Sequence, residues 1–447
     1  MSNLKAGFSR ANINPPMGIP IRGYFKPRFA EAILDDLEVN ALALQLGDVT
    51  TLLITVDHCG LEQKITDAFR NAASEASGVP ADNVFISATH THTAPEVLLE
   101  TENELIKEYT TFVQRRIADV SKFAVSDLKD AKMGFGKGKA PNVAFVRRYR
   151  MKDGSVATNP GVNNPNIVHP IGDIDDSVNV LRFDREGADT IVFVNFGNHP
   201  DVVGGSKISA DWPGLLRKDV EIILDGTKCI FFNGAQGDIN HVNVHPKAGD
   251  FNNMFNDFDD VSRGYAHAEY VARVVLGGVL QAFDKVHYID VDKLISKQEI
   301  INVPSHKPDP KDMPEAHRIN DLHNAGKDNE LPYEGMMLTT VVAEAGRMVR
   351  LENAPDAFDM RLSAVVIGPI AIIGIPGEPF AGIGRGLKET EGYEMILPCC
   401  LTNGSQGYFP MQDSYDEGGY EARSSNFKAG VAEFIISEGQ KLLTSLK

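Results

Sequence analysis

The segment from residue 51 to residue 88 constrains the fold more than any other part of the chain. Its first stretch, T-L-L-I-T-V-D, is apolar and β-prone, and residues 61–76 follow with helical spacing up to Gly78, a residue type that often ends helices. Residues 84–88 are β-prone again. A strand, a helix and a strand in this order predict parallel pairing with a right-handed crossover, and hence an α/β fold.

The remaining patterns extend this fold along the chain. Further strands are predicted at 37–46, 132–135, 178–183, 190–196, 228–232, 287–303, 361–367, 370–375 and 394–400, and helices at 102–128, 213–224, 261–283 and 427–443. Residues 137–176 are predicted to form a long loop, and the polar stretch 304–332 with the helical run 333–352 predicts a helical excursion around 304–352. We therefore expect a mixed, largely parallel central sheet flanked by helices.

Reactive side chains follow five of the predicted strands, at the point where each strand stops. They are His90, His199, Asp238, Glu378 and Tyr408. In open α/β sheets, ligands bind at the carboxyl edge because the loops converge there. Residues from 90 to 408 can share one site only if most of the chain folds together, so we expect a single catalytic domain over residues 1–447.

The most distinctive of these segments runs from Ile86 to Pro95 and reads I-S-A-T-H-T-H-T-A-P. On an extended backbone, residues i and i+2 project to the same face, so His90 and His92 would direct both imidazoles at one point. One metal ion could bind both, or one imidazole could bind metal while the other handles protons or substrate. A structural role without metal is the alternative for either histidine.

The charge and composition of the chain exclude some classes of binding partner. The net charge of −17 and the pI near 5.2 argue against nucleic acid and anionic membranes, because both would be repelled. The chain has no apolar run of 18 residues, and its N-terminus lacks the apolar core of a signal peptide, which predicts a cytoplasmic location without a stable membrane anchor. The four cysteines are too few and too irregular for a disulfide framework and are expected to be reduced core residues.

Several short motifs, taken in order, resemble a known family. They are S-A-T-H-T-H-T-A-P at 87–95, N-H-P at 198–200, G-D at 237–238, P-G-E at 376–378, and Gly-Tyr at 407–408 followed by a tyrosine at 420. Together they are similar to the neutral ceramidases, which are zinc-dependent amidases of the neutral/alkaline non-lysosomal type. The resemblance covers nearly the whole chain and concerns the catalytic domain of that family.

The resemblance implies a role for each matching residue. One zinc ion per chain would be ligated by His90, His199, Glu378 and Tyr408. His92 would contact substrate or handle protons, and Tyr420 would stand across from it near the reacting carbonyl. A substrate-contacting arginine would be Arg147 or Arg148, with solvated loop charges as the alternative, and the substrate would also meet Gly23 and Asp238.

Amide hydrolysis by activated water is the chemistry that such a set implies. Zinc with two neutral imidazoles and one carboxylate lowers the pKa of water from ~15.7 towards ~7. The resulting hydroxide would attack the amide, Tyr420 or an arginine would stabilise the oxyanion, and His92 would return a proton to the leaving amine.

Three departures from the family pattern bear on the substrate. Gly234 stands where the family carries a serine, which disfavours a covalent serine mechanism. The chain has no room for the extra C-terminal β-sandwich domain of the larger ceramidases, and it shows no apolar or basic stretch for docking on a bilayer. We therefore expect a small or soluble N-acyl substrate, with an N-acyl-sphingoid lipid as the alternative.

Two other functions compete with the amidase. His241, Asn243 and His245 would share one face of an extended segment and could hold a second ion, which would favour an ester or phosphate hydrolase or a lyase. A catalytically inactive, ligand-binding protein is the third hypothesis, with Gly234 as its sign of drift. Asp211 is expected to cap the helix that begins near Pro213.

Overall fold

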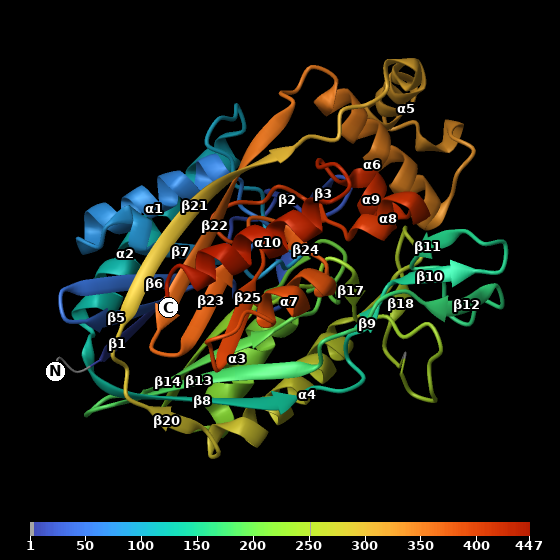
Figure 1. Cartoon of the computed structure of the whole chain (residues 1–447). Helices are drawn as coiled ribbons and strands as arrows, with labels where there is room; N and C mark the ends of the chain where they lie inside the picture. Colours follow the sequence, from blue (N-terminus) through green and yellow to red (C-terminus); the bar gives the residue numbers. More distant parts are fainter. Residues whose placement is uncertain (1–3, 251) are drawn as a thin grey trace.

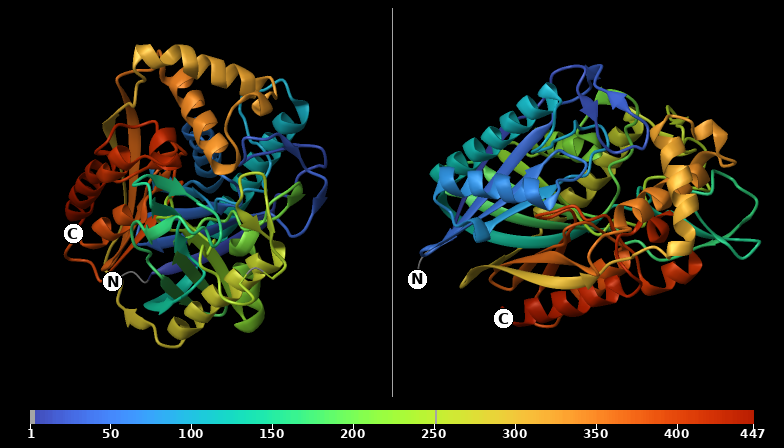
Figure 2. Two further views of the ribbon diagram at one scale, coloured as in Figure 1. Left: turned by 90° about the vertical axis from the view of Figure 1, so that its right-hand side faces the viewer. Right: turned by 90° about the horizontal axis from the view of Figure 1, so that it is seen from above.

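Two β-sheets pack face to face between helices, so the chain forms four layers in the order helix, sheet, sheet, helix (Figures 1 and 2). The structure is a computed structural model that describes residues 4–250 and 252–447. Within these residues the larger sheet has nine strands, in the order β16-β14-β13-β8-β1-β5-β6-β7 with β20 paired to β8. Their bounds are β1 (Lys5–Asn12), β5 (Glu38–Leu46), β6 (Val49–Val56), β7 (Val84–Ala88), β8 (Lys129–Lys139), β13 (Ser177–Arg185), β14 (Thr190–Phe196), β16 (Thr227–Asn233) and β20 (His287–Ile289).

The second sheet covers one face of the first and runs in the order β21-β22-β23-β25. Its strands are β21 (Leu294–Pro304), β22 (Ala357–Ile367), β23 (Ile370–Gly374) and β25 (Met395–Cys399). Successive side chains of a strand point to opposite faces, so Leu42 of β5 enters the core between the sheets while Ala41 enters the core under the helices. Phe193 and Phe232 stack between the sheets with ring centres 4.7 Å apart.

Helices cover the outer faces of both sheets. Helices α1 to α4 pack on the larger sheet, and α7 and α10 pack on the second sheet. Their bounds are α1 (Gln63–Ser77), α2 (Glu104–Ser126), α3 (Asp211–Ile223), α4 (Tyr265–Phe283), α7 (Ala381–Lys388) and α10 (Val431–Thr444). Helix α1 ends as expected at Gly78, whose φ of +77° suits glycine.

The expected helical excursion is confirmed. Helices α5 (Met313–Asn324) and α6 (Gly335–Leu351) pack on each other through a small apolar core of their own that includes Met313, Ile319 and Val341. They stand at the upper right of Figure 1, next to α8 (Gln412–Glu417) and α9 (Tyr420–Ser424). That the whole chain forms one domain stays a prediction.

The mixed α/β class is confirmed, but three details of the prediction are wrong. Most neighbouring strands of the larger sheet are antiparallel; among the described strands of this sheet, parallel pairing joins β6 to β7 and β14 to β16. Residues 137–176 contain short strands rather than one loop, and β10 pairs with β11 and β12. Helix α4 begins at Tyr265, not at residue 261, because the preceding residues belong to a short strand.

The remaining short strands connect these layers or flank the strand ends. They are β2 (Pro20–Ile21), β3 (Arg28–Phe29), β4 (Ala32–Ile33), β9 (Phe145–Val146), β10 (Arg148–Met151), β11 (Val156–Thr158), β12 (Ile167–Pro170), β15 (Lys207–Ile208), β17 (Ile239–Asn240), β18 (Phe255–Asn256), β19 (Ser262–Arg263), β24 (Glu378–Pro379) and β26 (Tyr408–Phe409).

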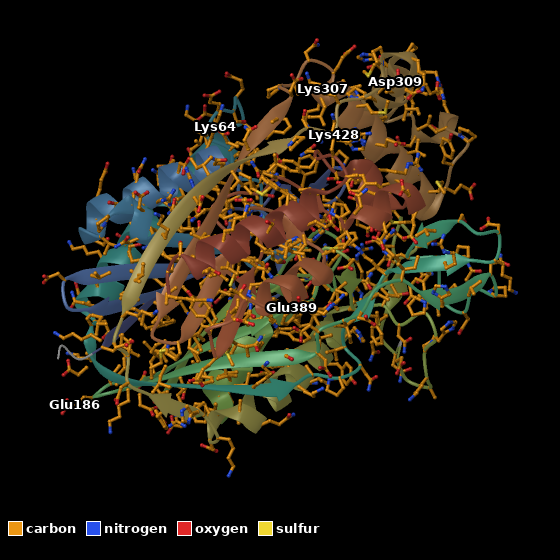
Figure 3. The ribbon with its side chains drawn as sticks, viewed as in Figure 1. Lys64, Glu186, Lys307, Asp309, Glu389 and Lys428 are labelled. Atoms are coloured by element: carbon orange, nitrogen blue, oxygen red, sulfur yellow. The ribbon has the colours of Figure 1, made fainter. Side chains whose placement is uncertain are left out.

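Charged side chains of both signs project from the outer surface, as Lys64, Glu186 and Lys428 illustrate in Figure 3. The four cysteines are buried and unpaired, as expected. None of the helices in the described part of the chain combines the length and apolar character needed to cross a membrane.

Candidate metal centre

Four of the expected ligands come from strand ends that meet inside the molecule. His90 follows β7 and His199 follows β14. Glu378 opens β24, soon after β23, and Tyr408 opens β26. Because β24 and β26 pair in parallel with Glu378 opposite Tyr408, these two side chains are brought to the same place. The strand ends therefore converge here as expected.

The donor atoms of three residues are spaced as ligands of one ion would be. Nε2 of His90 lies 3.0 Å from Nε2 of His199 and 3.2 Å from Oε2 of Glu378. Nε2 of His199 lies 3.5 Å from the same oxygen. Donor atoms bound tetrahedrally to zinc at about 2.0–2.1 Å lie roughly 3.3 Å apart. The buried Oε2 of Glu378 has no well-directed hydrogen bond among the described residues, so the three side chains fit a bound cation.

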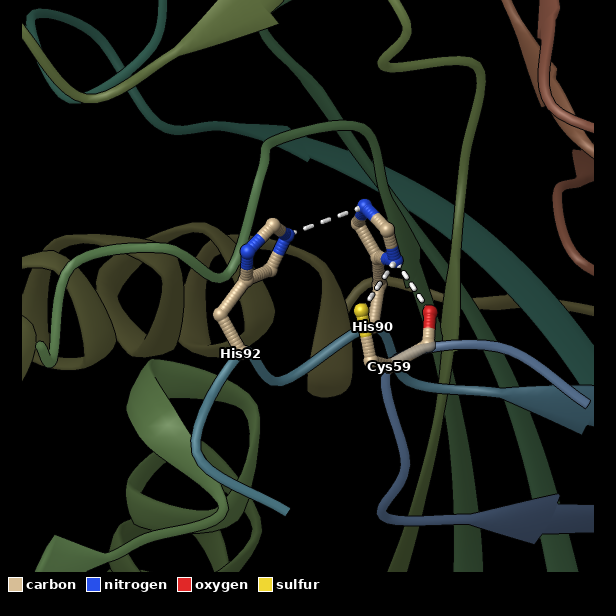
Figure 4. Close-up of side chains that lie close together, drawn as sticks. All are labelled: Cys59, His90 and His92. Atoms are coloured by element: carbon tan, nitrogen blue, oxygen red, sulfur yellow. Dashed lines mark hydrogen bonds between the residues drawn. The ribbon is translucent and has the colours of Figure 1, made fainter. Parts of the chain in front are cut away.

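Backbone carbonyls orient both imidazoles. Nδ1 of His90 contacts the carbonyl oxygen of Cys59, and Nδ1 of His199 lies 3.2 Å from the carbonyl oxygen of Gln236 (Figure 4 shows the first contact). A carbonyl accepts only, so each contact assigns the ring proton to Nδ1. Each Nε2 then presents its lone pair to the cluster, which is the form that binds metal.

The backbone at this site differs from the extended form that the sequence suggested. The φ of His90 is +82°, in the left-handed region, so the extended-strand reason for pairing His90 with His92 is wrong even though their rings do meet. Such a backbone at a non-glycine residue is often found at functional sites. The Asn233 side-chain amide at the end of β16 donates to the carbonyl oxygens of Thr89 (3.2 Å) and Asn198 (3.1 Å), and thereby ties the two histidine segments together.

Charges within the cluster set its protonation. Burial alone would lower the pKa of His90, but the Glu378 carboxylate and Cys59 together outweigh it and raise this pKa well above its usual value. Burial, reinforced by Arg147, lowers the pKa of His199 well below its usual value. Burial acts to raise the pKa of Glu378, yet His90 together with Arg147 outweighs it and lowers this pKa. Without metal, His90 therefore carries a second proton, on Nε2, in addition to the one on Nδ1.

We expect the zinc affinity of this site to rise with pH by on the order of tenfold per unit, because zinc must displace one proton from His90. Below the raised pKa of His90 the proton competes with the metal, and above it the competition ends. Competition with a fluorescent chelator at several pH values measures the slope. An affinity that is flat over pH 6 to 8 (about two pH units) would contradict the assigned proton.

Tyr420 and Arg147 border the cluster beside Tyr408. The Tyr420 ring centre lies 5.6 Å from that of Tyr408, and the Arg147 guanidinium lies 5.3 Å from the Tyr408 ring centre. Arg147 also donates to Glu421 at 2.7 Å. Burial first, and then the charge of Glu378, raises the pKa of Tyr420, so its hydroxyl keeps its proton. The arrangement supplies one hydroxyl donor and one fixed positive charge.

Arg148, the other candidate arginine, points away from the cluster and towards α8. Its guanidinium donates to the Ser414 hydroxyl at 2.8 Å and to Glu417 at 3.2 Å. Both partners belong to α8, so Arg148 attaches this helix to β10. The structure thus brings Arg147, and not Arg148, to the cluster.

His92 lies next to His90, and Gly23 lies against His92. The two Nε2 atoms are 3.3 Å apart (Figure 4). Burial lowers the pKa of His92 to about 3. Gly23 has a φ of +116°, and a Cβ there would lie 3.1 Å from His92 atoms, so only glycine lets the backbone approach this ring.

Asp238, His241 and His245 lie outside the candidate metal centre. Asp238 accepts the N–H of Ala381 at 2.7 Å and so holds the start of α7, and burial raises its pKa to about 6. The described part of the chain contains two groups of possible metal ligands: Cys59 with His90 and His92, and His90 with His199 and Glu378. Neither group includes His241 or His245.

The sequence did not reveal that two residues, Asn233 and Asp211, hold the segments of the site together. Asn233 could have been found as a polar residue that ends a buried strand. The prediction that Asp211 caps the helix is wrong, because α3 begins at Asp211 itself and Ala210 takes the cap position. The Asp211 carboxylate instead accepts the N–H groups of Val202 and Val203, at 3.0 and 2.8 Å, and so fixes the loop after His199.

Comparison with known proteins gives a fold but no sequence family. No protein-family model matches the chain, and no curated protein sequence matches it. Among solved structures, neutral ceramidase from Pseudomonas aeruginosa matches with a TM-score of 0.73 and 15% identity, over 100% of this chain and 75% of the ceramidase chain. A ceramidase complexed with C2 matches with a TM-score of 0.72 and 14% identity, over the same shares. The chain therefore has the fold of the neutral ceramidases.

Proposed function

We propose that the protein is a metal-dependent hydrolase that cleaves the amide bond of an N-acyl compound, with one zinc ion held by His90, His199, Glu378 and Tyr408. The observation that carries this proposal is the convergence of two oriented imidazoles and a carboxylate, with donor atoms 3.0 to 3.5 Å apart. A bound zinc ion would polarise the amide carbonyl and make hydroxide available near neutral pH. The shared fold with ceramidases supports the amide as the bond cleaved.

The surrounding side chains would perform the rest of the chemistry. The Tyr420 hydroxyl donates to the carbonyl oxygen as it becomes negative, and Arg147 adds a fixed positive charge nearby. His92 is uncharged and lies at the edge of the cluster, so its ring can take a proton and pass it to the leaving amine.

The cleft next to Tyr420 indicates the kind of substrate. It has a volume of about 480 Å³, and its lining combines polar residues such as Asn159 and Arg423 with Met336 and Met337. This size and mixture suit an N-acyl compound with a polar amine portion and a short acyl chain. An N-acyl-sphingoid lipid is the longer-chain alternative.

We expect the zinc-loaded protein to release free amine from N-acyl compounds, and to do so faster for short than for long acyl chains. The assay uses one amine acylated with chains from acetyl to palmitoyl, an N-acyl-sphingoid lipid, and the matching esters and a phosphate ester. Chelation should stop the release and added zinc should restore it. Cleavage of esters or phosphates without any amide cleavage would overturn the proposal.

A further inference from the structure

Asp201 has a partly buried carboxylate that is fixed without help from His92. Arg263 donates to both of its oxygens, from Nε at 2.9 Å and from Nη2 at 2.7 Å. The Tyr24 hydroxyl donates to Oδ1 at 2.6 Å. Arg263 is only 1% exposed and also makes two hydrogen bonds to Asp259, at 2.7 and 2.9 Å. Asp201 and Asp259 thus share this arginine.

The ring of His92 lies between this carboxylate and the candidate metal centre. Its Nδ1 is 3.7 Å from Oδ1 of Asp201 and has no hydrogen-bond partner among the described residues. Its Nε2 faces the opposite way, 3.3 Å from Nε2 of His90 (Figure 4). The two ring nitrogens thus face two different environments, one anionic and one metal-binding.

The surroundings restrict how the His92 ring can turn. The His92 backbone N–H donates to the carbonyl oxygen of Pro200 at 3.2 Å, which joins the segment of His92 to the segment of Asp201. The Gly23 backbone lies against its Cα, Cβ and Cγ, and the Tyr24 ring centre is 5.7 Å away. Nδ1 therefore stays on the side of Asp201, since exchanging the two nitrogens requires the ring to flip inside this packing.

We propose that Asp201 is a positioning residue that holds the proton of His92 on Nδ1 and so presents the lone pair of Nε2 to the metal centre. A neutral imidazole carries one proton, and a neighbouring carboxylate can only accept it, so the carboxylate selects the tautomer. With the lone pair on Nε2, the ring can accept a proton from the reacting side. The catalytic part of this inference rests on the proposed function, because it assigns the proton transfer of that reaction to this tautomer.

Nitrogen NMR of the zinc-loaded protein with ¹⁵N-labelled histidine tests the tautomer without any activity measurement. The His92 signals are identified by their loss in His92→Gln. We expect the wild-type protein to carry the proton on Nδ1, and Asp201→Asn, which removes the negative charge beside Nδ1, to move it partly to Nε2. A His92 proton on Nε2 in the wild-type protein would overturn the proposal, and this result needs His92→Gln only to identify the signals.

Kinetics with a matched control separate positioning from simple support of the fold. We expect Asp201→Asn to lower kcat by about 10² or more with KM within about threefold and with the same zinc content. Asp259→Asn removes a carboxylate from the same arginine without touching His92, and should keep kcat within about threefold. Equal losses in both variants would show a structural role. If no substrate is cleaved by the wild-type protein, the proposed function fails, while the NMR result still decides the tautomer.

Discussion

Replacing Glu378 by glutamine is expected to lower kcat/KM for amide hydrolysis by about a thousandfold or more. The neutral amide cannot balance the charge of a metal ion, and losing the ion removes several kcal/mol of transition-state stabilisation, each 1.36 kcal/mol being about tenfold in rate. Steady-state kinetics with an activated N-acyl substrate and excess zinc measure the change.

The fold of this variant should be intact. In the metal-free protein, Glu378 is paired with the protonated His90, so its neutral substitute removes a favourable interaction. The loss in the free energy of unfolding should be small at neutral pH, because His90 can then lose its proton and no charge is left unpaired. His241→Gln is the matched control, since His241 is equally buried but bonds the carbonyl oxygen of Ser262 at 2.6 Å and lies outside the cluster. Retained activity in Glu378→Gln would exclude Glu378 as a ligand.

Arg147→Met is expected to damage stability and activity together. Glu421 is completely buried and its carboxylate is paired with Arg147 at 2.7 Å, so removing the arginine leaves an uncompensated buried charge that costs about 3–5 kcal/mol. Unfolding in urea measures this loss.

A double variant separates the two effects. Adding Glu421→Gln to Arg147→Met removes the unpaired charge and should restore most of the free energy of unfolding, while kcat stays low because the positive charge beside Tyr408 is still missing. If the double variant regained full activity, the contribution of Arg147 would be structural only.

The strand and helix positions were largely visible in the sequence, but the direction of the strands was not. Strands that are buried on both faces read as continuous apolar runs, which is typical of parallel sheets. Here β5 and β13 are antiparallel to their neighbours, and they are apolar on both faces because a second sheet covers one face and helices cover the other. An apolar run therefore shows that a strand is buried on both faces, but not whether helices or a second sheet cover it, nor the direction in which it runs.

For the candidate metal centre, too, the sequence indicated some residues and left others to the structure. Residue types and their positions after strands indicated His90, His199 and Glu378, because few other roles account for such groups at the ends of buried strands. The choice between Arg147 and Arg148 depended on which of two adjacent buried side chains lies beside the cluster, which packing decides. The contact of His92 with Asp201 joins residues 109 positions apart in sequence, so it became visible only in the structure.

The zinc content of the purified protein tests the central claim most directly. Inductively coupled plasma mass spectrometry of the wild-type chain, beside His90→Ala and Glu378→Ala, should find about one zinc per chain in the first and almost none in the two variants. A folded wild-type protein that binds no metal, or variants that keep it, would contradict the candidate metal centre and with it the proposed amide hydrolysis.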